Sequence, residues 1–318
     1  MPWLADAFRR LALALAEDRQ HPALLVAGPP GTGKGDFARA FAAAALCHER
    51  AGDAPACGRC RDCTLLAAGT HPDFTRVTLE EREPGKLRTE ITVEQVRALC
   101  ARLALASQFG GWQVAVVDPA DKMNASAANA LLKTLEEPSA SSLIVLVSDD
   151  PSRLPATIRS RCQRIDAAAP PEGVALDWLE SAGLDRDSAR AALAASAGNP
   201  GLALQWSRDG TAALDAACRS ELASLAAGRS SAMAVAESWA ADRPRERLWF
   251  ACVEAAGKAR RLAATPMRDD ALTATTEIQK LTAWFAAATR ARRLLDTTVR
   301  ADLVLLDVMR QWPRQGST

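Results

Sequence analysis

A glycine-rich loop near the N-terminus has the residue types of a phosphate-binding site. Residues 28–35 read Gly-Pro-Pro-Gly-Thr-Gly-Lys-Gly, after an apolar run at 23–26 and before a helix-like run from residue 36. In this layout successive backbone N–H groups and a helix N-terminus face an anion, and the lysine reaches the phosphates. The expected nucleotide-binding residues are Gly28, Gly31, Gly33 and Lys34. A hydroxyl residue after the lysine would ligate Mg²⁺, but the sequence has Gly35 at this position.

Asp118 is a further candidate residue of the nucleotide site. It follows the continuous apolar run at residues 113–117, and P-loop enzymes place at such a strand end the carboxylate that organises the metal's water shell. Hydrolysing members of this class continue with a glutamate that polarises the attacking water. This chain continues with Pro119, which has neither a carboxyl group nor a backbone donor. Gly35 and Pro119 therefore both predict a site that hydrolyses ATP poorly.

The spacing of four cysteines predicts a metal site. Cys57, Cys60 and Cys63 are separated by two residues each, and Cys47 lies ten positions before the first of them. Four thiolates can close a tetrahedral Zn²⁺ shell, and such a closed shell is structural rather than catalytic. His48 is an alternative fourth ligand in place of Cys47, and a redox pair of thiols is the alternative to a metal. We expect one structural Zn²⁺ held by the four cysteines.

The elements that would position these residues alternate between strands and helices in the first half of the chain. Strands are expected at residues 23–26, 73–79, 113–118 and 143–147, and helices at 1–20, 36–47, 92–106 and 125–137. Such alternation predicts an α/β fold with a parallel sheet. After the Ala/Pro linker at 167–171 no convincing strand follows. Residues 172–208 suggest a small helical unit, and residues 210–318 suggest longer helices.

Composition and charge narrow the class of protein. A chain of 318 residues predicts two or three domains. Its 39 Lys and Arg balance 38 Asp and Glu, which argues against a strongly basic nucleic-acid binder. The N-terminus carries charges where a signal peptide needs an apolar core, and no run approaches the roughly 20 apolar residues that span a bilayer. We expect a cytoplasmic location without membrane contact, where cysteines stay reduced.

Further motifs carry a resemblance to a known family. Residues 129–138 read Asn-Ala-Leu-Leu-Lys-Thr-Leu-Glu-Glu-Pro, residues 69–73 read Gly-Thr-His-Pro-Asp, and residues 160–162 read Ser-Arg-Cys. With the glycine loop and the cysteines, they resemble the AAA+ clamp-loader ATPases of bacterial replication over about residues 1–208. The resemblance implies an AAA+ core at 1–166 with a zinc module at 47–63, a helical lid at 167–208, and an all-α collar at 209–318.

The same resemblance implies a function and partners. Motor subunits of the family carry Ser or Thr at position 35, Glu at 119 and an arginine near 201, whereas this chain has Gly35, Pro119 and Gly201. These departures resemble the family's stator, a subunit that does not turn over ATP. In the family the arginine of the Ser-Arg-Cys motif acts in trans on a neighbour's ATP, and this implies an arginine finger at Arg161.

The implied assembly is a five-subunit ring with gamma/tau-type motor subunits and a clamp-opening delta subunit. Through this ring the chain would meet the sliding clamp and primed DNA. Two alternatives stay open from the residues alone: an ATP-hydrolysing motor subunit of the same loader, and a zinc-stabilised nucleotide-binding module without a replication role. Binding of ATP without hydrolysis at residues 28–35 is open as well.

Overall fold

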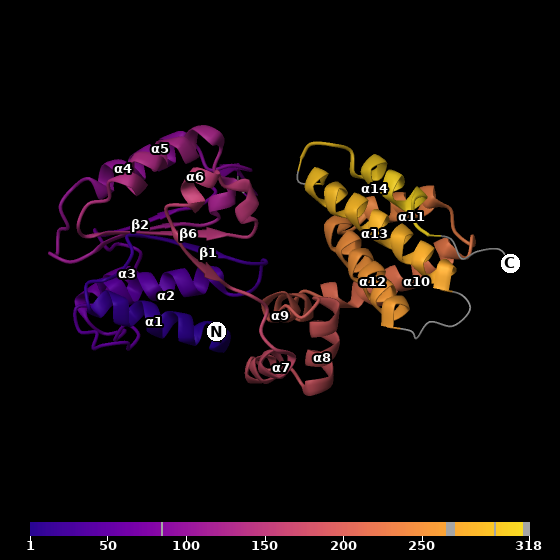
Figure 1. Cartoon of the computed structure of the whole chain (residues 1–318), viewed down its shortest axis with the longest axis horizontal. Helices are drawn as coiled ribbons and strands as arrows, with labels where there is room; N and C mark the ends of the chain where they lie inside the picture. Colours follow the sequence, from indigo (N-terminus) through magenta and orange to yellow (C-terminus); the bar gives the residue numbers. More distant parts are fainter. Residues whose placement is uncertain (84, 265–270, 296, 314–318) are drawn as a thin grey trace. The chain divides into compact units, whose positions relative to one another are not determined.

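The architecture is seen in a computed structural model that describes residues 1–83, 85–264, 271–295 and 297–313 (Figure 1). Parts of the expected collar, at 265–270, 296 and 314–318, lie outside these residues. Two compact units divide the chain. One comprises Met1–Trp178 with Asn199–Leu202, and the other Leu179–Gly198 with Ala203–Thr318. Among the described helices, none combines the length and apolar character needed to cross a membrane.

A five-stranded parallel sheet forms the centre of the first unit, with the order β2-β5-β6-β1-β7. The strands are β1 (Ala23–Ala27), β2 (Phe74–Val77), β5 (Gln113–Val117), β6 (Ser142–Ser148) and β7 (Gln163–Asp166). Every residue of β1, β5 and β6 is buried, as expected for central strands covered on both faces. The predicted parallel α/β core is therefore confirmed.

Helices cover both faces of this sheet. Side chains along β1 point alternately to the two sides and so pack under both layers of helices. Leu25 packs into a cluster with Val96, Leu131 and Ile158, under the helices α4, α5 and α6. Leu24 faces the other side, among residues of α1 and α2 such as Phe41. Figure 1 shows the two helical layers above and below the strands. The helices are α1 (Ala5–Ala16), α2 (Lys34–Leu46), α3 (Arg61–Ala67), α4 (Val93–Leu103), α5 (Ala125–Glu136) and α6 (Ala156–Arg159).

Local sequence sets where these helices begin. A capping box begins α4, with the Thr92 backbone N–H donating to Gln95 Oε1 at 3.0 Å. Asn124 caps α5 by accepting from the Ala127 N–H at 2.9 Å. The first unit also contains short elements: η1 (Pro2–Leu4), β3 (Glu81–Glu83), β4 (Lys86–Leu87), η2 (Ala120–Lys122) and η3 (Pro151–Arg153). The β3–β4 hairpin and the edge strand β7 were not predicted.

Past Asp166, every element in the described part of the chain is a helix. They are α7 (Glu172–Ser181), α8 (Arg186–Ala195), α9 (Pro200–Arg208), η4 (Thr211–Ala213), α10 (Leu214–Ala226), α11 (Ala232–Ala241), α12 (Pro244–Ala264), α13 (Ala271–Leu294) and α14 (Ala301–Arg310). The second unit has its own core, which includes the fully buried Trp239, Phe250 and Trp284. The division between the units runs through α7 and α9.

Candidate functional site

The glycine loop connects β1 to the N-terminus of α2, as the sequence predicts. Gly33 caps α2 with a left-handed backbone (φ 83°), a conformation that favours glycine. The Gly28 N–H donates to the Ser148 carbonyl at 3.2 Å, which ties the loop to the carboxyl end of β6. Ligands of open α/β sheets bind at this edge, beyond the carboxyl ends of the strands. The loop therefore has the position of a phosphate cradle.

Lys34 is bound by oxygens of the chain itself. Its side chain is 3% exposed, and its Nζ lies 2.7 Å from Asp149 Oδ1. The same ammonium donates to the Pro29 carbonyl, which also accepts from Thr32 Oγ1 at 2.9 Å. A phosphate would have to compete with Asp149 and Pro29 for this cation. The ammonium that should contact the nucleotide is thus already paired with a carboxylate of the chain.

The outer side of the glycine loop is held by residues from both ends of the first unit. Trp3 Nε1 donates to the Thr32 carbonyl at 2.9 Å. The Asn199 side chain donates to the Pro30 carbonyl and accepts from the Leu202 N–H at 3.1 Å. Within this unit, the start of α9 therefore lies directly on the loop.

Gly201 contacts the loop backbone to backbone. A Cβ atom at this position would lie 2.0 Å from the Gly31 carbonyl oxygen. The resemblance places the lid arginine of motor subunits near this position, and here the space admits no side chain at all. Glycine is required at 201 because another chain segment approaches too closely for anything larger.

We predict that Gly201→Ala lowers the free energy of unfolding by about 1–3 kcal/mol, because the added methyl group forces the loop and α9 apart. Gly173→Ala is the matched control. Gly173 lies in α7, and a Cβ atom there would meet no other atom within 4 Å, so alanine should be neutral or stabilise by up to about 1 kcal/mol. Urea denaturation of both variants makes the comparison. If Gly201→Ala unfolds at the same urea concentration as the wild type, the close approach of residue 201 to the Gly31 carbonyl is wrong.

Asp118 and Gly35 lie together at the base of the loop, as the motif predicts. A Cβ atom on Gly35 would lie 3.0 Å from Asp118 Oδ2. Burial raises the pKa of the Asp118 carboxyl above its usual value, and the positive charge of Arg76 offsets part of this effect. Arg76 Nη2 lies 3.6 Å from Asp118 Oδ2. The cation that this carboxylate meets in the chain is thus a guanidinium from β2.

Arg161 lies in the segment between α6 and β7. Its Nη2 lies 2.7 Å from Glu136 Oε1, and its Nη1 donates to the Thr157 carbonyl at 2.9 Å. The side chain is 36% exposed. The neighbouring Cys162 packs against the core, and burial raises the pKa of its thiol to about 11. The Ser-Arg-Cys motif therefore anchors a cysteine inward and presents an arginine at the surface.

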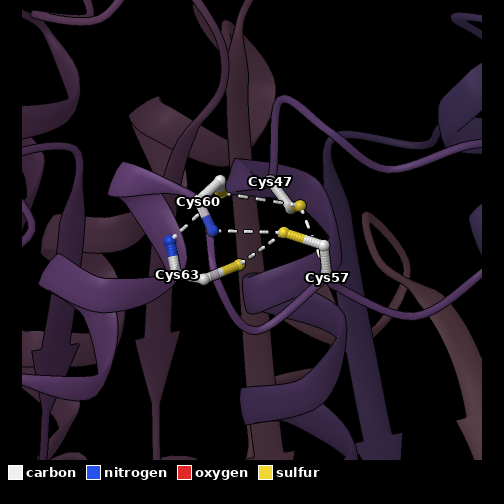
Figure 2. Close-up of side chains that lie close together, drawn as sticks. All are labelled: Cys47, Cys57, Cys60 and Cys63. Atoms are coloured by element: carbon white, nitrogen blue, oxygen red, sulfur yellow. Dashed lines mark hydrogen bonds between the residues drawn. The ribbon is translucent and has the colours of Figure 1, made fainter.

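The structure brings Cys47, Cys57, Cys60 and Cys63 together (Figure 2). Their sulfur atoms all lie within 4.8 Å of one another, and Figure 2 shows them turned toward a common centre. The Cys47–Cys60 and Cys57–Cys63 sulfur distances are 3.9 and 4.0 Å. A tetrahedral zinc with Zn–S bonds of about 2.3 Å requires sulfur separations of about 3.8 Å. The four thiols therefore fit a metal ion of this kind.

Backbone donors support thiolates in this cluster. The Cys60 N–H points at Cys57 Sγ at 3.3 Å and the Cys57 N–H at Cys47 Sγ at 3.4 Å. Hydrogen bonds from the Arg59 and Cys60 backbone lower the pKa of Cys57. Burial, by contrast, raises the pKa of Cys63 to about 12. A bound dication would favour the thiolate form of every cysteine in the cluster, including those whose pKa is raised by burial.

His48 is directed to another partner. Its Nδ1 lies 2.8 Å from Asp62 Oδ2, while Cys47 completes the sulfur group.

Several site residues were missed from the sequence. They are Arg76 and Asp149 near the glycine loop, Asn199 over it, Ser148, whose buried hydroxyl lacks a hydrogen-bond partner within the described residues, and Asp62 beside the cysteines. For Asp149, its place just after the buried strand β6 was the available signal.

Comparisons with known proteins find matches to subunits of DNA polymerase III. The family model described as "DNA polymerase III, delta subunit" matches residues 3–170. The chain is 40% identical over 219 residues to DNA polymerase III subunit delta' of Pseudomonas aeruginosa, covering 68% of this chain and 65% of that protein. It is 40% identical over 204 residues to the subunit delta' of Escherichia coli, covering 64% and 59%. It is 32% identical over 158 residues to the subunit tau of Bacillus subtilis, covering 50% and 26%. The matched stretch thus spans less than two thirds of each relative.

Proposed function

The chain belongs to the DNA polymerase III delta-subunit family, and from this membership we propose that it is the delta-prime-type, non-motor subunit of a bacterial clamp loader. In this role it would support ATPase neighbours in a ring that places the sliding clamp on primed DNA. Its partners would be gamma/tau-type motor subunits and a clamp-opening delta subunit in a five-subunit assembly. The proposed organisation is an AAA+ core at 1–166, a lid at 167–208 and an oligomerisation collar at 209–318.

One observation carries the non-motor assignment: the chain's own groups occupy the contacts that a nucleotide would need. Asp149 neutralises Lys34, and Gly201 lies against Gly31 where the resemblance puts a lid arginine. Gly35 and Pro119 remove the hydroxyl and the carboxylate that hydrolysis uses. Four separate positions therefore argue in the same direction.

The chemistry we assign to the chain is donation of Arg161 to a neighbour's ATP. A planar guanidinium beside the γ-phosphate neutralises charge as the phosphoryl group leaves. Support comes from the position of Arg161 at the surface, where its side chain is 36% exposed. A structural Zn²⁺ bound by the four cysteines would hold residues 47–63 in their folded form.

An ATP-hydrolysing motor subunit is the second candidate. It is favoured by the retained Lys34, by Asp118 facing position 35, and by the similarity to a tau subunit. The isolated chain distinguishes the two candidates. We expect no ATP turnover above the background set by a Lys34→Ala chain, since Lys34 is already paired with Asp149.

This expectation is checked by measuring ATP hydrolysis of the isolated wild-type and Lys34→Ala chains, with and without primed DNA. Robust turnover that Lys34→Ala abolishes would overturn the non-motor assignment. In the same samples, saturating ATP with Mg²⁺ should leave the melting temperature of the wild-type chain unchanged, because a ligand stabilises a protein only by binding its native state.

A further inference from the structure

A buried carboxylate lies beside the cysteine cluster, between two of its members. Asp62 is in the first turn of α3, between Cys60 and Cys63, and the residue is 5% exposed. Its two oxygens have different partners. Oδ2 lies 2.8 Å from His48 Nδ1, and Oδ1 lies 3.3 Å from His71 Nε2. One carboxylate thus links α3 to two other segments of the chain.

The hydrogen bonds around His71 show which segments of the chain Asp62 connects to α3. His71 Nδ1 accepts from the Asp73 N–H at 3.1 Å, so the proton of a neutral ring is on Nε2, facing Asp62. Asp73 in turn accepts from Ser107 Oγ and from the Phe109 N–H, both at 3.0 Å. The chain of hydrogen bonds therefore runs from α3 through the turn before β2 into the loop before β5. A buried network of this kind rigidifies the segments that it joins.

A second contact fixes the same helix to the same loop. The guanidinium of Arg61, the residue before Asp62, lies 4.1 Å from the centre of the Phe109 ring. The ring of Phe109 also meets the edge of His71, with 5.5 Å between centroids. Two consecutive residues of α3 therefore attach it to the turn before β2 and to the loop before β5.

The four sulfur ligands lie on two arms of the chain. Cys47 follows the end of α2, whereas the other three cysteines belong to the loop and start of α3. His48 comes directly after Cys47, so its bond to Asp62 joins the two arms at the cluster itself. The bond from Asp62 to His71 fastens the second arm to the sheet. Both links form between protein groups alone and need no metal.

We propose that Asp62 is a positioning residue that preorganises the cysteine cluster for its metal ion. This inference rests on the metal site of the proposed function. Without Asp62 the two arms would lose these two links, and the metal would have to supply more of the free energy that brings the sulfur atoms together. Groups that orient metal ligands in this way typically change metal affinity by 10- to 100-fold.

A competing explanation is that Asp62 is itself a ligand, since its Oδ2 lies 3.8 Å from Cys60 Sγ. The Co²⁺ absorption spectrum separates the two roles, because it reports the donor atoms around the ion. A positioning residue changes the affinity and leaves the spectrum of the saturated protein unchanged. A carboxylate ligand changes the spectrum as well.

The experiment measures Zn²⁺ affinity by chelator competition in the full chain, for the wild type and for Asp62→Ala, Asp62→Asn and His48→Ala. We expect Asp62→Ala to weaken Zn²⁺ binding by about 10- to 100-fold, with a Co²⁺ spectrum like that of the wild type. Asn has a single acceptor oxygen and can serve one histidine, so Asp62→Asn should lie between. His48→Ala should also weaken binding, because it removes the link between the arms.

Asp53→Ala is the matched control, since Asp53 is an exposed acid between Cys47 and Cys57, and it should bind Zn²⁺ like the wild type. Equal affinities of the wild-type and Asp62→Ala chains would overturn the positioning role and leave the metal site intact. An altered Co²⁺ spectrum would make Asp62 a ligand instead. A wild-type chain that binds no Zn²⁺ would overturn the metal site itself.

Discussion

Arg161→Ala is expected to leave the chain folded and able to assemble while lowering ATP hydrolysis of the complete clamp loader. At the one ATP site that Arg161 serves, the loss should be about 10³-fold, the lower range for an arginine finger. The side chain is at the surface and its partner Glu136 is 48% exposed, so their ion pair contributes little to stability. Arg161→Lys should not restore the rate, because an ammonium lacks the planar, bidentate geometry of the guanidinium.

The measurement is DNA-stimulated ATP turnover of complexes reconstituted with motor and clamp-opening subunits, after their assembly has been verified by size-exclusion chromatography. Arg153→Ala is the control: Arg153 is an exposed arginine on η3, close to Arg161 in the sequence. It should leave turnover unchanged. If Arg161→Ala complexes assemble and hydrolyse ATP at the wild-type rate, the finger assignment is wrong. If they fail to assemble, Arg161 is an interface residue instead.

Cys60→Ser is expected to remove bound Zn²⁺ and to destabilise the first unit. Serine cannot replace a thiolate in an all-sulfur shell, and Cys60 also caps α3 by accepting from the Cys63 N–H. A native-state ligand present at a thousandfold its dissociation constant stabilises a protein by about 4 kcal/mol. The wild-type chain should lose a comparable amount when a strong chelator removes the metal.

Metal analysis and thermal melting, each with and without chelator, make this test. The wild-type chain should contain about one zinc ion, as expected for four thiolates in one shell. Cys100→Ser serves as the control, because Cys100 is a partly buried thiol on α4 outside the cluster. It should keep the metal. A Cys60→Ser chain that retains a full equivalent of zinc would contradict the four-cysteine shell.

The sequence predicted the sheet well where strands were central. β1 and the interiors of β5 and β6 are continuous apolar runs, and each strand was found at its expected place. The edge strand β7 was missed, because only Ile165 of its four residues is buried and the run has no apolar pattern. The β3–β4 hairpin was missed for the same reason, since β3 consists of exposed charged residues.

The family was also predicted from short motifs, and the match over residues 3–170 confirms it. The roles that the family suggested for single residues stay predictions. Arg161 as a finger and the four cysteines as zinc ligands await the experiments above, and the collar at 209–318 also stays a prediction. For Cys57, Cys60 and Cys63 the spacing alone suggested the cluster. Two intervening residues are too short a piece of chain to hold neighbouring thiols far apart.

By itself, the sequence determined the chemistry that the chain can offer: a glycine loop with a lysine, four thiols in one short segment, and an arginine in a Ser-Arg-Cys motif. Only the tertiary structure decided how these groups are used. It brought Asp149 to Lys34, Gly201 to Gly31, and two histidines to Asp62. Parallel strands gather residues distant in the sequence at one edge of the sheet, and no local pattern records which of them will meet there. The glycine loop therefore keeps its form, while residues from other segments contact its lysine and its outer side.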